Sequence, residues 1–133
     1  MIEIDDISLY RYAQSRGYEP LIDERFSLEI HLRVEIQREI FGTDHEKFYR
    51  WMWEHRPHIC EETMQPLRGY SAAYVSHILT RGAHPEMAHD PRNINILCLE
   101  AHHRWEFGQR VGMRIYESNQ LKIQQLKQEY SRL

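Results

Sequence analysis

Residues 57–108 constrain the fold most, because two short apolar runs interrupt the helical pattern of the chain there. Residues 74–79 (YVSHIL) alternate as a short strand, and residues 94–99 (INILCL) indicate a second strand. A loop rich in breakers, TRGAHPEMAHDPR, joins the two runs, and EAHHRWEFG begins a helix that Gly108 ends. The predicted order is therefore strand, loop, strand, helix.

The flanking segments have helical patterns. Residues 6–16 and 121–130 place apolar side chains at helical spacing, and Thr43 or Asp44 can cap a helix over residues 44–56 whose aromatic side chains belong in the core. Residues 23–41 alternate like a strand, but their length, composition and following Gly42 favour a helix. The flanks are therefore predicted to be helical.

These patterns predict an α+β fold in which helices from both ends of the chain pack a hairpin and its following helix. No repeat or linker marks a boundary, so residues 1–133 are expected to form a single domain. Its parts are a helical N-terminal part (1–56), a hairpin-and-helix core (57–108) and a C-terminal helical extension (109–133).

No apolar run approaches the roughly 20 residues of a membrane span, and the acidic start lacks a secretory pattern, which favours a cytoplasmic protein.

Charge is distributed unevenly along the chain. Net charge is −3, but residues 1–54 carry 7 basic and 12 acidic side chains, whereas residues 55–133 carry 10 basic and 8 acidic ones. Seven of the nine histidines lie between His55 and His103. Eight of the ten basic residues in the C-terminal part are Arg, which suits phosphate contacts but is also an ordinary surface residue. Phosphate binding, if present, is expected in that part.

The core segment resembles the HNH nuclease family, whose pattern runs from a Cys pair through a His on a first strand to Asn-Leu-x-x-Leu-Cys-x-x-Cys-His. The matching stretches are residues 76–78 (SHI) and 93–102 (NINILCLEAH), within a resemblance that covers about residues 57–107. Residues 81–86 (RGAHPE) also look like phage recombination nucleases of the NinG (Rap) type. The resemblance implies a ββα-metal core that binds one divalent ion, Mg²⁺ or Mn²⁺.

The resemblance also implies roles for the matching residues. His77 corresponds to the general base, and a neutral imidazole with a pKa of about 6.5 suits that task near neutral pH. His102 corresponds to the metal ligand, with His103 as the alternative because neighbours on a helix point about 100° apart. Asn93 would order the loop through hydrogen bonds to the backbone or bind the metal through its amide oxygen.

Three further side chains are candidate DNA contacts. Arg81 lies in the RGAHPE stretch and Arg104 on the motif helix, where either could bind phosphate or form a surface ion pair. His84 in the loop could contact phosphate or bind a second metal, as could His89, although solvent exposure is the simpler interpretation for both.

The chain departs from the family pattern at two places. Ser76 stands where many members have a metal-binding Asp, and a hydroxyl is a far weaker ligand than a carboxylate. Cys60 and Cys98 keep only the first cysteine of each C-x-x-C pair, so no structural zinc is expected; a site using His58 with both cysteines is the minority alternative. Two cysteines are compatible with reduced thiols, and a bridge between them is possible but not favoured.

The sequence therefore predicts a metal-dependent HNH endonuclease that hydrolyses phosphodiester bonds in duplex or branched DNA. The resemblance points to phage recombination or DNA processing in the cytoplasm of a bacterial or phage-infected cell. Two alternatives remain. One is a catalytically inactive HNH-like module that only binds DNA. The other is a small helical interaction protein that docks a partner through the helix of Trp51 and Trp53 and the C-terminal helix. Oligomeric state, DNA specificity and the choice of DNA over RNA are not indicated.

Overall fold

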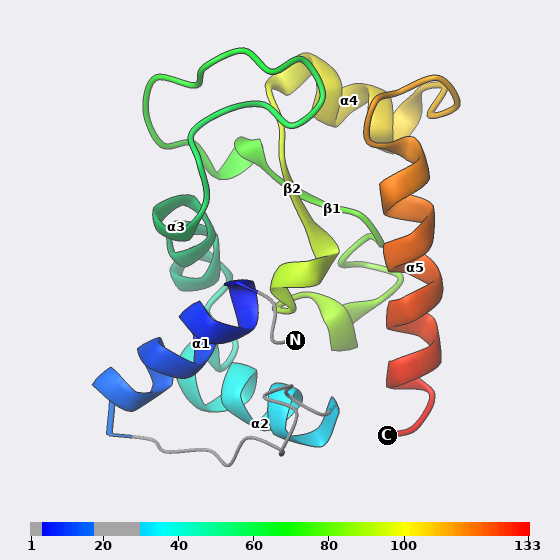
Figure 1. Ribbon diagram of the computed structural model, residues 1–133. Coiled ribbons are helices and arrows are strands. Elements are labelled where there is room, and N and C mark those ends of the chain that lie inside the picture. Colours follow the sequence, from blue (N-terminus) through cyan, green and yellow to red (C-terminus); the bar gives the residue numbers. More distant parts are fainter. Residues whose placement is uncertain (1–3, 18–29) are drawn as a thin grey trace.

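The computed structural model describes residues 4–17 and 30–133 as five α-helices and a two-stranded antiparallel sheet (Figure 1). The mixed architecture agrees with the predicted α+β class, although residues 23–29 of the second expected helix lie outside the described residues. The elements in chain order are α1 (Ile4–Ser15), α2 (Ile30–Phe41), α3 (His45–His55), β1 (Val75–His77), β2 (Ile94–Ile96), α4 (Leu99–Phe107) and α5 (Tyr116–Tyr130).

The hairpin lies at the centre of the fold, between α3 on one side and α5 on the other (Figure 1). Its register pairs Val75 with Ile96, Ser76 with Asn95 and His77 with Ile94. Both strands are shorter than the predicted six-residue runs. A 3₁₀ turn at Ala72–Tyr74 takes the first residue predicted for β1, whereas Cys98 and Leu99, predicted for the second strand, cap and begin α4. The predicted order of strand, loop, strand and helix is confirmed.

Helices α1, α2 and α3 pack against one face of the hairpin. Asp44 begins α3 by accepting a hydrogen bond from the Lys47 N–H at 3.0 Å, so it is Asp44 that caps the helix. The apolar face of α3 is buried in a cluster that also takes in hairpin side chains. The members from α3 and the strands are Phe48, Trp51, Met52, Trp53, Val75, Ile94 and Ile96. The prediction that the α3 aromatics belong to the core is confirmed.

Helices α4 and α5 cover the remaining sides of the hairpin. Trp105 of α4 is buried, and its indole N–H donates to the Ile78 carbonyl at 3.1 Å. On α5, the Asn119 amide donates to the Asn95 side chain at 2.7 Å. Helix α5 begins five residues before the predicted segment, and its longer packing surface explains how a three-residue hairpin is held.

The loop between the strands is anchored by a buried ionic network. Asp90 is fully buried and accepts hydrogen bonds from Arg33 of α2 at 3.3 Å, from Arg92 at 2.9 Å and from the Tyr130 hydroxyl of α5 at 2.9 Å. Arg92 also bonds both carboxylate oxygens of Glu129. One short segment is thereby connected to two helices that are far apart in the sequence.

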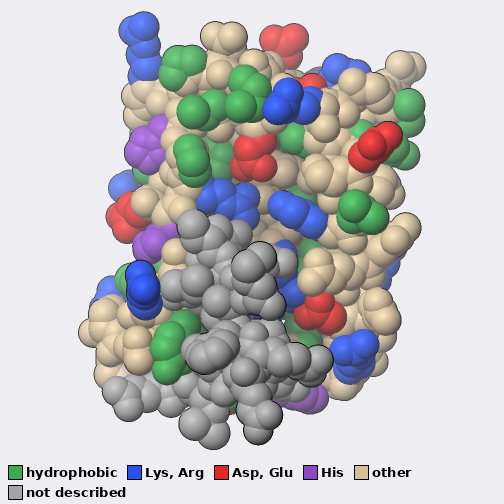
Figure 2. All heavy atoms as spheres, in the orientation of Figure 1, with side chains coloured by type: hydrophobic (Ala, Val, Ile, Leu, Met, Phe, Trp, Pro, Cys, Tyr) green, Lys and Arg blue, Asp and Glu red, His purple; other side chains and the backbone are tan. Residues whose placement is uncertain are grey.

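Basic and acidic side chains are interspersed on the face shown in Figure 2 rather than gathered into one basic field. Any attraction of this face for a polyanion therefore depends on individual side chains. Among the described residues, no helix is both long enough and apolar enough to cross a membrane.

Candidate functional site

A cleft of about 470 Å³ brings together residues from three separate parts of the chain. Its walls include His77 at the end of β1, Arg81 in the following loop, and His102 and Glu106 on α4. Tyr49 of α3 also lines it. Three residues singled out from the sequence, one from the first strand, one from the loop and one from the helix, thus share a cavity.

His77 is held in one tautomer by the backbone. Its Nε2 lies 2.9 Å from the Ala88 carbonyl oxygen, which can only accept, so Nε2 carries the hydrogen and Nδ1 is left unprotonated in the neutral ring. Burial lowers the pKa of His77, the Ala88 contact partly offsets this, and the charges of Arg81, His45 and His102 lower it further. The imidazole is therefore neutral near pH 7 and able to accept a proton.

Asn93 fixes the loop that supplies this carbonyl. Its amide oxygen accepts from the Leu79 N–H at 2.8 Å, and its amide nitrogen donates to the carbonyls of Leu79 and Met87 at 3.0 and 3.3 Å. The Asn93 side chain thus joins the two ends of the loop through Leu79. It also bonds Met87, the residue before Ala88. Asn93 is fully buried and does not line the cleft. In this geometry it acts by positioning His77.

His102 and Glu106 form a pair one helical turn apart on α4. The His102 Nδ1 lies 2.6 Å from the Ala73 carbonyl, so Nδ1 carries the hydrogen and Nε2 keeps its lone pair. That Nε2 lies 3.4 Å from a carboxylate oxygen of Glu106. Metal-binding histidines usually donate their second ring N–H to a carbonyl or carboxylate, which is the arrangement seen here. Both side chains line the cleft.

Arg81 is exposed and reaches across the cleft to α3. Its guanidinium donates to the Tyr49 hydroxyl at 2.7 Å, and the Tyr49 ring meets the His77 ring edge-on at a centroid distance of 5.9 Å. The Tyr49 contact leaves other guanidinium N–H groups for an anion, since Arg has five donors. Arg81 is the cation that lines this cleft among the described residues.

Three other predicted site residues lie elsewhere within the described chain. His84 contacts Glu86 at 3.4 Å in the loop, and Arg104 donates to a carbonyl of the segment after α4 at 2.8 Å. His103 points away from His102 and lies beside the ring of Phe107. Arg104 therefore bonds the segment that follows its own helix and does not line the cleft.

Ser76 is directed away from the cleft. Neighbouring strand residues point to opposite faces, so Ser76 lies opposite His77, against α5. It is fully buried and pairs across the hairpin with Asn95, which bonds Asn119. The family's carboxylate at this position therefore has no counterpart in this cleft; the carboxylate present is that of Glu106.

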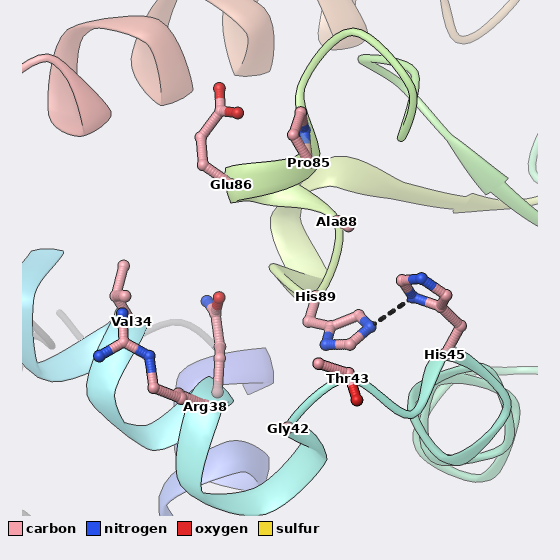
Figure 3. A pocket seen from close by; sticks show the side chains of 10 residues that line it. Val34, Arg38, Gly42, Thr43, His45, Pro85, Glu86, Ala88 and His89 are labelled. Atoms are coloured by element: carbon pink, nitrogen blue, oxygen red, sulfur yellow. Dashed lines mark hydrogen bonds between the residues drawn. The ribbon is translucent and has the colours of Figure 1, made fainter.

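A second cleft of about 280 Å³ is lined by residues of α2, of the start of α3 and of the loop around Ala88 (Figure 3). His89 points from the loop towards His45 of α3, with their nitrogens 2.8 Å apart, and the His89 ring packs on Phe48. Burial and then the charges of His45, His77 and Arg81 lower the pKa of His89 to about 4, and burial also lowers the pKa of His45. The pair is neutral near pH 7 and joins the loop to α3.

Sequence reasoning missed Glu106, Tyr49 and His45. Glu106 could have been found, because it follows His102 by four residues on a predicted helix and such residues share a face. Tyr49 and His45 come from α3, whose pattern indicated core packing alone. Nothing local in the sequence brings α3 to the edge of β1.

The donor set can hold a metal only with help from water or substrate. Within residues 4–17 and 30–133, no group of three or more His, Cys, Asp or Glu side chains is arranged for a metal ion. His58, considered above for a zinc site, stacks on Trp53 at a centroid distance of 3.7 Å. No protein-family model matches the chain, and no curated protein or solved structure shows significant similarity to it.

Proposed function

We propose that this protein is a metal-dependent HNH-type endonuclease that hydrolyses phosphodiester bonds in DNA. The observation that carries the proposal is the pairing of His77 and His102 across one cleft. Each has one ring nitrogen bonded to a backbone carbonyl, so each keeps the other nitrogen for chemistry. The sheet and α4 follow the order of a ββα-metal core, which supports the same proposal.

His77 acts as the general base. Its Nδ1 takes a proton from a water molecule as that water attacks phosphorus, and the Ala88 carbonyl stabilises the imidazolium that results. The lowered pKa keeps the ring unprotonated before the reaction. Asn93 contributes indirectly, since it holds the loop that carries Ala88.

His102 Nε2 and the Glu106 carboxylate would hold the divalent metal. Mg²⁺ keeps several waters and commonly takes only one or two protein ligands, so a two-residue site completed by water and phosphate fits it, and Mn²⁺ accepts the same nitrogen and oxygen donors. The bound ion would neutralise charge that develops on the phosphate and its leaving oxygen. Because only two side chains contribute, tight metal binding is expected to require DNA.

Arg81 would orient the scissile phosphate. Its exposed guanidinium lies on the same cleft as His77 and can offer two parallel N–H groups to phosphate oxygens while Tyr49 fixes its position. The net negative charge of the chain makes such a local contact more important than a general basic surface.

Nicking of supercoiled plasmid with Mg²⁺ or Mn²⁺ tests the proposal. Wild type is expected to nick the plasmid, and His77→Ala and His102→Ala to lose about 10²-fold or more in rate. His103→Ala is the matched control, because it removes the neighbouring imidazole outside the cleft. Intact plasmid with wild type under both metals, or equal losses for His102→Ala and His103→Ala, would overturn the assignment.

A DNA-binding module without activity is the second candidate, and the two-residue metal site is the observation that favours it. Gel retardation without nicking under either metal would identify it. Trp51 and Trp53 are 2% and 8% exposed and pack in the core, which disfavours docking of a partner through α3.

A further inference from the structure

Cys60 and Cys98 lie near the start of α4. Both are free, and both belong to an apolar cluster that includes Ile78 and Trp105. Cys60 is fully buried, whereas Cys98 is half-buried and is the N-cap residue of α4. Two separate parts of the chain thus each bring one thiol to the same apolar cluster.

The two thiols lie close enough to influence each other. Burial and then the neighbouring Cys60 thiol raise the pKa of Cys98, and the Cys60 sulfur accepts a hydrogen bond from the Thr63 N–H at 3.4 Å. Burial alone would raise the pKa of Cys60, but hydrogen bonds from Thr63 and from the backbone of Cys98 and Glu62 lower it below its ordinary value. The arrangement favours a thiolate at Cys60 beside a protonated partner.

The backbone on both sides of the pair is already fixed. The Glu61 N–H donates to the Ile96 carbonyl at 2.8 Å, which joins the turn after Cys60 to β2 two residues before Cys98. The Glu61 carboxylate also accepts from the Ile96 N–H, and the Cys60 N–H donates to Gln65. These hydrogen bonds hold the segment of Cys60 beside the strand that leads to Cys98.

We propose that Cys60 and Cys98 are a site of reversible oxidation, at which peroxide or a small-molecule disulfide forms an intramolecular disulfide bond. With hydrogen peroxide, each thiol loses its hydrogen, the S–S bond forms, and the peroxide is reduced to two water molecules. The half-buried Cys98 gives the oxidant access. The proposal is independent of nuclease activity.

The bridge would connect the turn at residues 60–65 to the helix end that carries His102. The His102 N–H donates to the Cys98 carbonyl at 2.9 Å, so the crosslink lies within the same helical turn. It would also close a long loop, from residue 60 to residue 98, which restricts the unfolded chain. The oxidised protein is therefore expected to unfold at a higher temperature than the reduced one.

The test compares the full chain after treatment with hydrogen peroxide or oxidised glutathione and after reduction with dithiothreitol. The oxidised monomer is expected to lose two hydrogen atoms by intact mass, to have no titratable thiol, and to melt about 10 °C higher than the reduced form. Dithiothreitol should reverse all three changes. Cys98→Ser should abolish them, and because Cys98 is half-buried this variant is expected to fold even where Cys60→Ser does not.

Several results would overturn the proposal. These are two thiols that remain titratable after oxidation, oxygen added to the sulfurs in place of a bridge, crosslinked dimers only, or an oxidised monomer that melts no higher than the reduced one. Plasmid nicking is not a readout, so failure of this proposal leaves the proposed nuclease function unaffected.

Discussion

Asp90 is predicted to be the charged side chain whose loss destabilises the fold most. Its carboxylate is fully buried and accepts hydrogen bonds from Arg33, Arg92 and Tyr130 at 2.9 to 3.3 Å. Burial alone would raise the pKa of Asp90, but the Arg33 and Arg92 guanidinium groups lower it well below its usual range. The ionised carboxylate is therefore part of the folded structure at every pH where the protein is ordinarily handled.

The variant Asp90→Asn keeps the shape of the side chain and removes its charge. Arg33, which is 1% exposed, loses the carboxylate it faces. The introduced amide nitrogen is itself a donor, and it is placed beside the donor groups of Arg33, Arg92 and Tyr130. Breaking a buried ion pair from one side costs about 3 to 5 kcal/mol, which is a large part of the stability of a chain this size. Glu46→Gln is the control: its pair with Arg50 is exposed and worth less than about 1 kcal/mol.

Urea unfolding followed by tryptophan fluorescence measures both variants against wild type. A depressed carboxyl pKa stabilises the fold above the unfolded value, about 3.9, and that contribution is lost as pH falls towards the folded value. The destabilisation by Asp90→Asn should therefore be about 1 kcal/mol smaller near pH 3 than near pH 7. A cost below about 1 kcal/mol near pH 7, or one that grows on acidification, would refute the reasoning.

Three further predictions concern the cleft. Asn93→Ala should lower the free energy of unfolding by about 2 to 4 kcal/mol in urea titrations, because it leaves backbone groups of the loop without partners; an effect below about 1 kcal/mol would contradict its role. The acid limb of the cleavage profile should have its midpoint below about pH 6.5, since the pKa of His77 is lowered and its deprotonated form is active; a midpoint above that value argues against His77 as base. Glu106→Gln should raise the Mg²⁺ concentration for half-maximal nicking by about tenfold, and an unchanged requirement would remove Glu106 from the metal site.

Local patterns in the sequence were enough to predict the order of elements around the site. Alternation in residues 74–79 and 94–99, the breakers between them and Gly108 after the helix each depend on neighbours in the chain. Element lengths were less accurate. Cys98 and Leu99, which were predicted as strand, cap and begin α4, so β2 ends at Ile96.

The cleft itself could be predicted only where its residues share an element. His102 and Glu106 lie on one helical face, and their spacing is visible in the sequence. Tyr49 lies on a helix whose pattern, with buried Phe48 and Trp51, indicates packing alone. Its place beside His77 follows from how α3 meets β1, a tertiary contact between segments far apart in the chain.

The loop between β1 and β2 carries both the buried ionic network of Asp90 and the Ala88 carbonyl that bonds His77. The Ala88 carbonyl fixes the tautomer of His77. In the sequence, Ala88 follows Met87, whose carbonyl is bonded by Asn93, and precedes the buried Asp90 by two residues. The carbonyl can accept the His77 N–H and stabilise the imidazolium only while it is held beside the ring, and the neighbouring ionic network helps to hold it there. Loosening of the network should therefore release the imidazole before the whole fold unfolds, so Asp90→Asn should lose cleavage at urea concentrations where its tryptophan fluorescence is still native.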